Sequence, residues 1–173
     1  GAHEFNEIFF ENVRVPASQL VGEENRGWYN VAVGLDFERS SIGATSAARR
    51  NVDDLVAFLR GREVPTTDST RFEVAEHAIG VQLLRNMAYY VASQQEKTGV
   101  APTRESQMAK LFGAELQQRI ASTSLRALGM EAAGTRGSSY AADIQYIFLR
   151  ATANTVEGGT SEVQRTVIAT RGL

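Results

Sequence analysis

Apolar residues recur at helical spacing over most of the chain, and glycine and proline divide this pattern into segments. From Trp28 to about Arg60, helix-forming residues dominate. The apolar positions of this run are Val31, Leu35, Ile42, Val52, Leu55, Val56 and Leu59. Because they are separated by roughly whole helical turns, they predict one long first helix.

Two further long helices follow, each after a break rich in glycine or proline. Gly61 and Pro65 separate the first helix from a second over about Ser69–Lys97, whose start is marked by Asp68. Pro102 precedes a third helix, which begins at Thr103 and ends near Gly129 and Gly134.

Shorter helices are expected over Ser138–Leu149 and from Thr160 and Ser161 to Thr170. Three long and two short amphipathic helices predict an all-α fold, an antiparallel up-and-down helical bundle. The segment from Phe5 to Val15 is instead rich in β-branched and aromatic residues and ends at Pro16, which predicts a short extended N-terminal segment.

Composition excludes several classes of function. The 173 residues are 43% hydrophobic and 22% charged with a net charge of −2, so nothing favours nucleic acid or an anionic membrane surface as a partner. The chain has no cysteine and two distant histidines, so we expect no disulfide and no metal site. No apolar run is long enough to span a bilayer and no signal peptide is recognisable, so we expect a soluble, cytoplasmic protein.

Four motifs resemble the acyl-CoA dehydrogenase family. They are Gly34-Leu-Asp-Phe-Glu-Arg-Ser40, the stretch from Phe9 to Trp28, Ala109-Lys-Leu-Phe-Gly-Ala-Glu-Leu-Gln-Gln-Arg119, and Asn154-Thr-Val-Glu-Gly-Gly-Thr-Ser-Glu-Val-Gln-Arg165. The resemblance covers about the whole chain, whereas a complete member is more than twice as long. It implies that residues 1–22 are a remnant of the middle β-domain with its connecting turn, and that residues 23–173 are the C-terminal helical bundle domain.

The resemblance implies a flavoprotein oxidoreductase of fatty acid or lipid metabolism. A complete member oxidises an acyl-CoA thioester to the 2,3-enoyl-CoA. A carboxylate removes the α-proton while the β-hydrogen leaves as hydride to FAD, and an electron-transfer flavoprotein accepts the electrons. We expect this fragment alone to be inactive, because the β-domain supplies half of the cleft.

Two glutamates are candidates for the base. A glutamate in a dry, apolar cleft becomes a stronger base because burial raises its pKa. In many members the base directly precedes the Gly-Thr-Ser of the late loop, but here Gly158 holds that place and Glu157 lies one residue too early. A one-residue offset moves a side chain by about 3.3 to 3.8 Å and turns it to another face.

The isovaleryl branch of the family instead has its base on the first long helix, in a Leu-Asp-Leu-Glu-Arg context, with glycine in the late loop. Leu35-Asp-Phe-Glu-Arg39 and Gly158 match both features, so the resemblance implies Glu38 as the base, with Glu157 as runner-up. The alternatives are a solvated helix residue for Glu38 and, for Glu157, a loop carboxylate near a helix N-terminus.

Other site residues are implied in the same way. Arg39 and Asp36 would support the substrate pocket, although they could equally form an exposed pair. Gly158 and Gly159 would allow close approach of the substrate or serve as a flexible turn. The residues expected to contact the flavin, or simply to cap a helix, are Thr160, Ser161 and Glu162.

One departure leaves the role of the subunit open. Members usually carry Arg-x-x-Phe-Gly between the first two bundle helices, reaching the flavin of a neighbouring subunit, but residues 59–67 contain no Phe-Gly pair. This loss resembles subunits of unequal two-chain dehydrogenases. The alternatives are a catalytic subunit, a non-catalytic partner subunit and an assembly domain, in a homo- or hetero-tetramer formed through the bundle.

Overall fold

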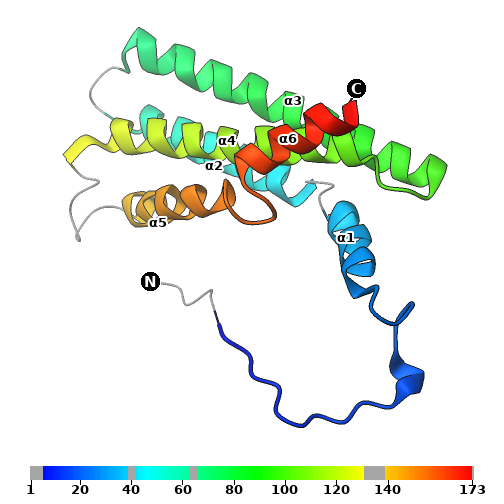
Figure 1. Ribbon diagram of the computed structural model, residues 1–173. Helices are drawn as coiled ribbons and strands as arrows, with labels where there is room; N and C mark the ends of the chain where they lie inside the picture. The colour runs from blue at the N-terminus through cyan, green and yellow to red at the C-terminus, as the bar shows by residue number, and fades with distance from the viewer. Residues whose placement is uncertain (1–5, 39–41, 63–65, 131–138, 173) are drawn as a thin grey trace.

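The computed structural model describes residues 6–38, 42–62, 66–130 and 139–172. Within these ranges the chain is all helical, which confirms the expected fold class (Figure 1). The helices are α1 (Gly27–Glu38), α2 (Ile42–Arg60), α3 (Asp68–Thr98), α4 (Thr103–Leu128), α5 (Ser139–Asn154) and α6 (Ser161–Gly172), preceded by a 3₁₀ turn, η1 (Ala17–Gln19). None of the helices in the described ranges is long and apolar enough to cross a membrane.

The ends of α3 follow from local chemistry. Thr67 is the N-cap, because its side-chain oxygen accepts a hydrogen bond from the Thr70 backbone N–H at 3.3 Å. At the other end Gly99 takes a left-handed conformation, with φ of 68°, and its N–H caps the Gln95 carbonyl. The expected helix over Ser69–Lys97 therefore differs from α3 by one residue at each end.

Helix α4 is the centre of the bundle and packs against α2, α3, α5 and α6. The main core joins α2, α3 and α4, and its buried members are Ala48, Val52, Val81, Leu84, Leu116 and Ile120. Helices α3 and α4 approach closely because each has a glycine facing a leucine of the other. A Cβ added at Gly80 would lie 2.8 Å from the Leu116 side chain, and one at Gly113 would lie 3.2 Å from Leu84.

A second core cluster closes the bundle where α5 begins. Leu128, Ala141 and Ile144 are buried there, and the rings of Phe58 and Tyr140 stack with centroids 4.7 Å apart. This cluster ties α5 to the ends of α2 and α4. Helix α6 then packs along the other half of α4 (Figure 1).

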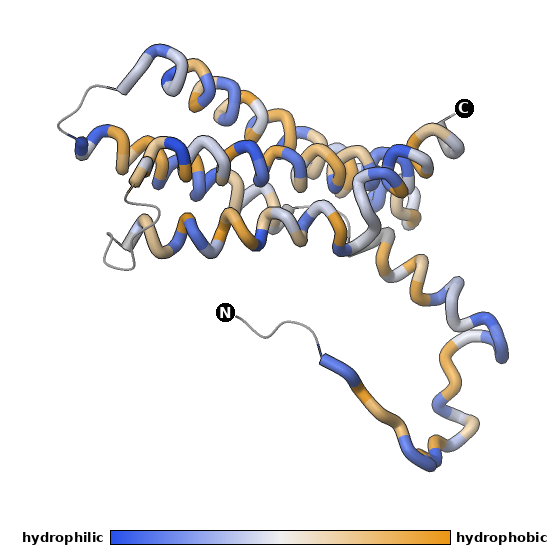
Figure 2. Tube along the Cα trace, turned by 60° about the vertical axis from the view of Figure 1, so that its left-hand side comes forward, coloured by the Kyte–Doolittle hydropathy of each residue, from blue (hydrophilic) through white to orange (hydrophobic). Residues whose placement is uncertain are grey.

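The first expected helix differs from the structure. Residues 27–60 contain two helices, α1 and α2, and residues 39–41 between them lie outside the described residues. In Figures 1 and 2, α1 points away from the bundle whereas α2 lies within it. Helical spacing continues through residues 35–42, so periodicity did not separate the two.

The strand-like pattern of residues 5–15 does not produce a strand in the described part, residues 6–15. A strand needs a neighbour to pair its backbone groups, and the helical bundle offers none. Its apolar side chains stay exposed, with Ile8 at 74%, Phe9 at 78% and Phe10 at 79%. The extended segment that contains these residues runs apart from the bundle (Figure 2).

Candidate functional site

The loop between α5 and α6 has a conformation that requires glycine. Gly158 and Gly159 both have positive φ, 63° and 102°, in the region that L side chains rarely adopt. A Cβ at Gly159 would also lie 2.6 Å from Nε2 of Gln164. At Gly158 the nearest atom to an added Cβ is Cε of Lys110, at 3.8 Å, so that residue has space beside it.

Two side chains hold this loop in place. Gln164 is 1% exposed, and its Nε2 donates to the Gly158 carbonyl at 3.0 Å and to the Gly159 carbonyl at 3.3 Å. Lys110, on α4, donates from Nζ to the Gly159 carbonyl at 2.6 Å. Oε1 of Gln164, on α6 beside the loop, is buried without a hydrogen-bond partner.

Sequence reasoning gave Lys110 and Gln164 no role, although both lie within the motifs that carried the resemblance. A glycine pair followed within six residues by a glutamine is a sequence pattern that can indicate a loop held by the glutamine side chain. Two left-handed residues expose two carbonyls on one side of the turn, and a buried amide is a natural donor to them.

Backbone N–H groups at the start of α6 have hydrogen-bond partners in the preceding loop. Ser161 N donates to the Thr155 carbonyl at 3.0 Å, Val163 N to Thr160 Oγ1 at 3.2 Å, and Gln164 N to the Thr160 carbonyl at 2.9 Å. The pKa of Glu162 is lowered, first by a hydrogen bond from its own backbone N–H and then by one from the Thr160 hydroxyl. Thr160 and Glu162 thus both cap the helix.

The N–H groups of Gly159 and Thr160 donate no hydrogen bond within the described residues. They are adjacent and follow the left-handed turn, an arrangement in which successive backbone N–H groups form a small concavity for an electronegative atom. The loop therefore offers two donors to an incoming carbonyl or anionic oxygen.

Glu157 lies at the edge of a groove beside this loop. The groove has a volume of about 390 Å³ and a wall of small residues contributed by α2 and α4. It is lined by Gly43, Ala44, Ala47, Ala109, Lys110, Gly113, Ala114, Gln117, Asn154 and Glu157. The Glu157 carboxylate accepts two hydrogen bonds from Arg150, at 2.9 and 2.8 Å, and its side chain is 51% exposed.

The other predicted base, Glu38, is the last residue of α1. The side chains of Glu38 and Asp36, and the whole of Arg39, lie outside the described residues. Gly43, five residues after Glu38, lines the same groove as Glu157. The structure therefore brings the beginning of α2 next to the late loop, and the choice between the two glutamates stays a prediction.

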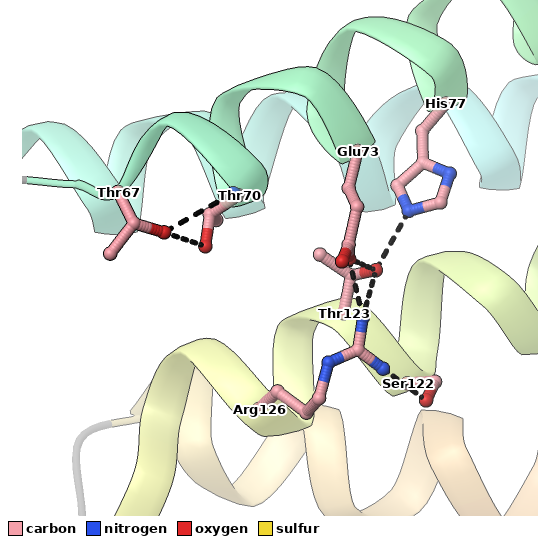
Figure 3. Close-up of polar contacts among 7 residues, drawn as sticks. All are labelled: Thr67, Thr70, Glu73, His77, Ser122, Thr123 and Arg126. Carbon is pink, nitrogen blue, oxygen red and sulfur yellow. Dashed lines mark hydrogen bonds and ion pairs between the residues drawn. The ribbon is translucent and has the colours of Figure 1, made fainter.

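His77 and Trp28 have different surroundings. Trp28 is 73% exposed, whereas His77 is 5% exposed and belongs to a polar network between α3 and α4 (Figure 3). The Thr123 hydroxyl donates to Glu73 at 2.6 Å, so it accepts from His77 Nε2 at 2.9 Å. No group of three potential metal-ligating side chains occurs in the described part of the chain.

Charged side chains around this network shift the pKa of His77 in both directions. Burial lowers the pKa of His77, and the positive charges of Arg119 and Arg126 add to that effect. Glu73 and Glu76 oppose it. The pKa of Glu73 is itself lowered, chiefly by the Thr123 hydrogen bond and then by Arg126, which donates to the same carboxylate oxygen (Figure 3).

Known proteins resemble this chain over nearly its whole length. Acyl-CoA dehydrogenase IpdE1 of Mycobacterium tuberculosis is 27% identical over 100% of this chain and 44% of its own length. Cyclohexane-1-carbonyl-CoA dehydrogenase of Geobacter metallireducens is 27% identical over 95% of the chain and 43% of its own. The solved structure named Tcur3481-Tcur3483 steroid ACAD is 26% identical, with a TM-score of 0.78, over 95% of the chain and 44% of its own.

The chain thus spans less than half the length of these relatives. The family model for the acyl-CoA dehydrogenase C-terminal domain matches residues 25–173. These residues include the bundle, the groove and the glycine loop, and the chain belongs to the acyl-CoA dehydrogenase family through its C-terminal domain.

Proposed function

We propose that this chain is the C-terminal part of an FAD-dependent acyl-CoA dehydrogenase, in which the glycine loop and the adjoining groove face the flavin and the thioester. The observation that carries the proposal is the pair of free N–H donors at Gly159 and Thr160, held beside a groove that contains a carboxylate. Such a set of groups suits a substrate whose carbonyl must be polarised while a neighbouring proton is removed.

The residues present fit a flavin. The isoalloxazine ring presents carbonyl oxygens that can accept from the Gly159 and Thr160 N–H groups. The space beside Gly158 allows the backbone to approach a planar ring, because an added Cβ would meet only Lys110 there. Bound FAD would supply the hydride acceptor for the β-hydrogen. The start of α6, formed by Thr160, Ser161 and Glu162, would contribute to flavin binding by fixing the position of these N–H donors.

The substrate proposed for the groove is an acyl-CoA thioester. Its walls are small side chains of α2 and α4, so an extended chain can lie against the helix backbones. Lys110 and Gln117 are its polar members on α4. The volume of about 390 Å³ lies in the lower part of the range of roughly 300 to 1,000 Å³ typical of small-molecule sites. Gly158 and Gly159 would border the thioester end.

For the base we retain Glu38, with Glu157 as the runner-up. A base needs a carboxylate oxygen free to meet the α-proton at about 2.6 to 3.2 Å. Both oxygens of Glu157 already accept hydrogen bonds from Arg150. The Glu157 side chain is 51% exposed and paired with Arg150 rather than enclosed in a dry cleft, which favours Glu38 for the role. Arg39 and Asp36 would then support the base from neighbouring positions.

Assembly through the bundle is supported by the outer face of α3. Phe72, Ile79, Leu83 and Tyr90 lie on this face at intervals of seven, four and seven residues, and each is 49% to 73% exposed. This spacing places them on one stripe of the helix, as in a helix pair between subunits. We propose that the stripe contacts another subunit in a homo- or hetero-tetramer, and that an electron-transfer flavoprotein reoxidises the flavin.

A second candidate is a non-catalytic subunit that completes the flavin site of a different chain. It is favoured by the missing Phe-Gly pair in residues 59–67. This alternative requires the bundle and its α3 stripe but no base at Glu38.

Expression of the full-length protein by itself, followed by an absorption spectrum, separates the two candidates. A yellow protein whose flavin absorption bleaches on addition of an acyl-CoA supports the catalytic proposal. A folded but colourless protein that binds flavin only after coexpression with a second dehydrogenase chain refutes it and supports the partner role.

A further inference from the structure

A second groove lies between α2 and α3, outside the site described above. It has a volume of about 330 Å³, and its buried floor is formed by Val81 and Ala88. Its lining from α2 is Thr45, Ser46 and Arg49, and from α3 it is Val81, Gln82, Arg85, Ala88 and Tyr89. None of these residues lines the groove that contains Glu157.

Two arginines, Arg49 and Arg85, line this groove, and each has guanidinium N–H groups without a partner among the described residues. Arg49 uses only its Nε, which donates to both Asp53 oxygens at 3.0 and 2.8 Å, so its terminal nitrogens keep their N–H groups uncommitted. The Arg85 guanidinium lies over the Tyr89 ring, 5.3 Å from its centroid, and has no carboxylate partner within the described residues. Stacking on the ring orients this guanidinium without using its donors.

The remaining polar groups favour an anion with more than two oxygens. Ser46 and Tyr89, which each have a hydroxyl group, line the groove together with Arg49 and Arg85. A carboxylate offers two acceptor oxygens, whereas a phosphate offers at least three and is well matched to a pair of arginines. One guanidinium charge is offset by Asp53 and the other is not, so the groove carries a net positive charge.

We propose that the α2–α3 groove is a binding site for a small phosphorylated ligand. Arg49 and Arg85 contact the phosphate oxygens, the hydroxyl groups complete the donor set, and the floor of Val81 and Ala88 holds the apolar part of the ligand. The site is independent of the flavin site and requires no further domain.

The test uses this chain of 173 residues and inorganic pyrophosphate as the probe, with acetate at matched ionic strength for comparison. Isothermal titration calorimetry should give saturable binding of pyrophosphate and none of acetate. Arg49→Gln and Arg85→Gln should each weaken binding by about tenfold or more, because each removes a charge-assisted contact.

Arg71→Gln is the matched control, because it removes the same charge from exposed α3 outside the groove, where Arg71 pairs with Asp68 at 3.8 Å. It should leave the affinity within about twofold. Circular dichroism of each variant checks that the helices remain. The proposal is overturned by absence of saturable binding, by equal binding of acetate, or by an equal loss in Arg71→Gln. Because the chain is tested without flavin, none of these results depends on the dehydrogenase proposal.

Discussion

Replacing Gly159 by alanine tests whether the late loop is held as the structure describes. The φ of 102° at Gly159 is outside the region open to alanine, which costs about 1 to 3 kcal/mol. The new Cβ would lie 2.6 Å from Gln164 Nε2, so the buried amide must move. It would then lose its hydrogen bonds to the Gly158 and Gly159 carbonyls, each contributing about 0.5 to 1.5 kcal/mol.

Together these effects predict a loss of about 2 to 6 kcal/mol for Gly159→Ala. Gly158→Ala is the matched comparison, because its φ of 63° is accessible to alanine at a cost of about 1 to 2 kcal/mol and its Cβ meets Lys110 at an ordinary 3.8 Å. Both variants change the entropy of the unfolded chain equally, so that effect cancels in the comparison.

Urea unfolding followed by circular dichroism measures both free energies of unfolding. In a Gln164→Ala background the extra cost of Gly159→Ala should shrink, because the amide that clashes with the new Cβ is gone. The reasoning is refuted if Gly159→Ala is no more destabilising than Gly158→Ala, or if the Gln164→Ala background leaves their difference unchanged.

Two further predictions concern the network between α3 and α4. Thr123→Val should destabilise the chain by about 1 to 3 kcal/mol, because it leaves His77 and Glu73 without their shared partner. Thr166→Val, at an exposed position, is the control and should change the free energy of unfolding by less than about 0.5 kcal/mol in the same urea assay. The unfolded chain binds a proton at His77 more readily than the folded chain does, since burial lowers the pKa of folded His77 below 6.5. The free energy of unfolding should therefore fall as pH drops below about 6.5, and His77→Gln should reduce this slope between pH 7.5 and 5.5; an equal slope in both proteins would contradict the account.

The bundle could be predicted because its signals are local. Asp68 marks the start of α3 in the sequence, although the capping side chain is that of its neighbour Thr67, and α3 extends one residue beyond each expected bound. Pro102 and Gly129 likewise bound α4, as the sequence predicts. Each of these signals acts within one or two helical turns, which is the range that periodicity and capping can report.

Features that depend on distant residues were not predictable in the same way. The partner of His77 is Thr123, which lies 46 positions later on another helix. Lys110 reaches the late loop across 49 positions. The pattern of residues 5–15 does resemble a strand, but whether it forms one depends on a sheet that the bundle does not supply. Packing between elements, rather than local preference, decides such cases.

We propose that the base is at the end of α1 and not in the late loop. The most direct measurement compares Glu38→Gln and Glu157→Gln in the full-length protein, by the rate at which an acyl-CoA bleaches the flavin in a single turnover. The account predicts that Glu38→Gln lowers this rate by at least about 100-fold while Glu157→Gln stays within about tenfold of the parent. The reverse order would contradict it and assign proton removal to the loop glutamate.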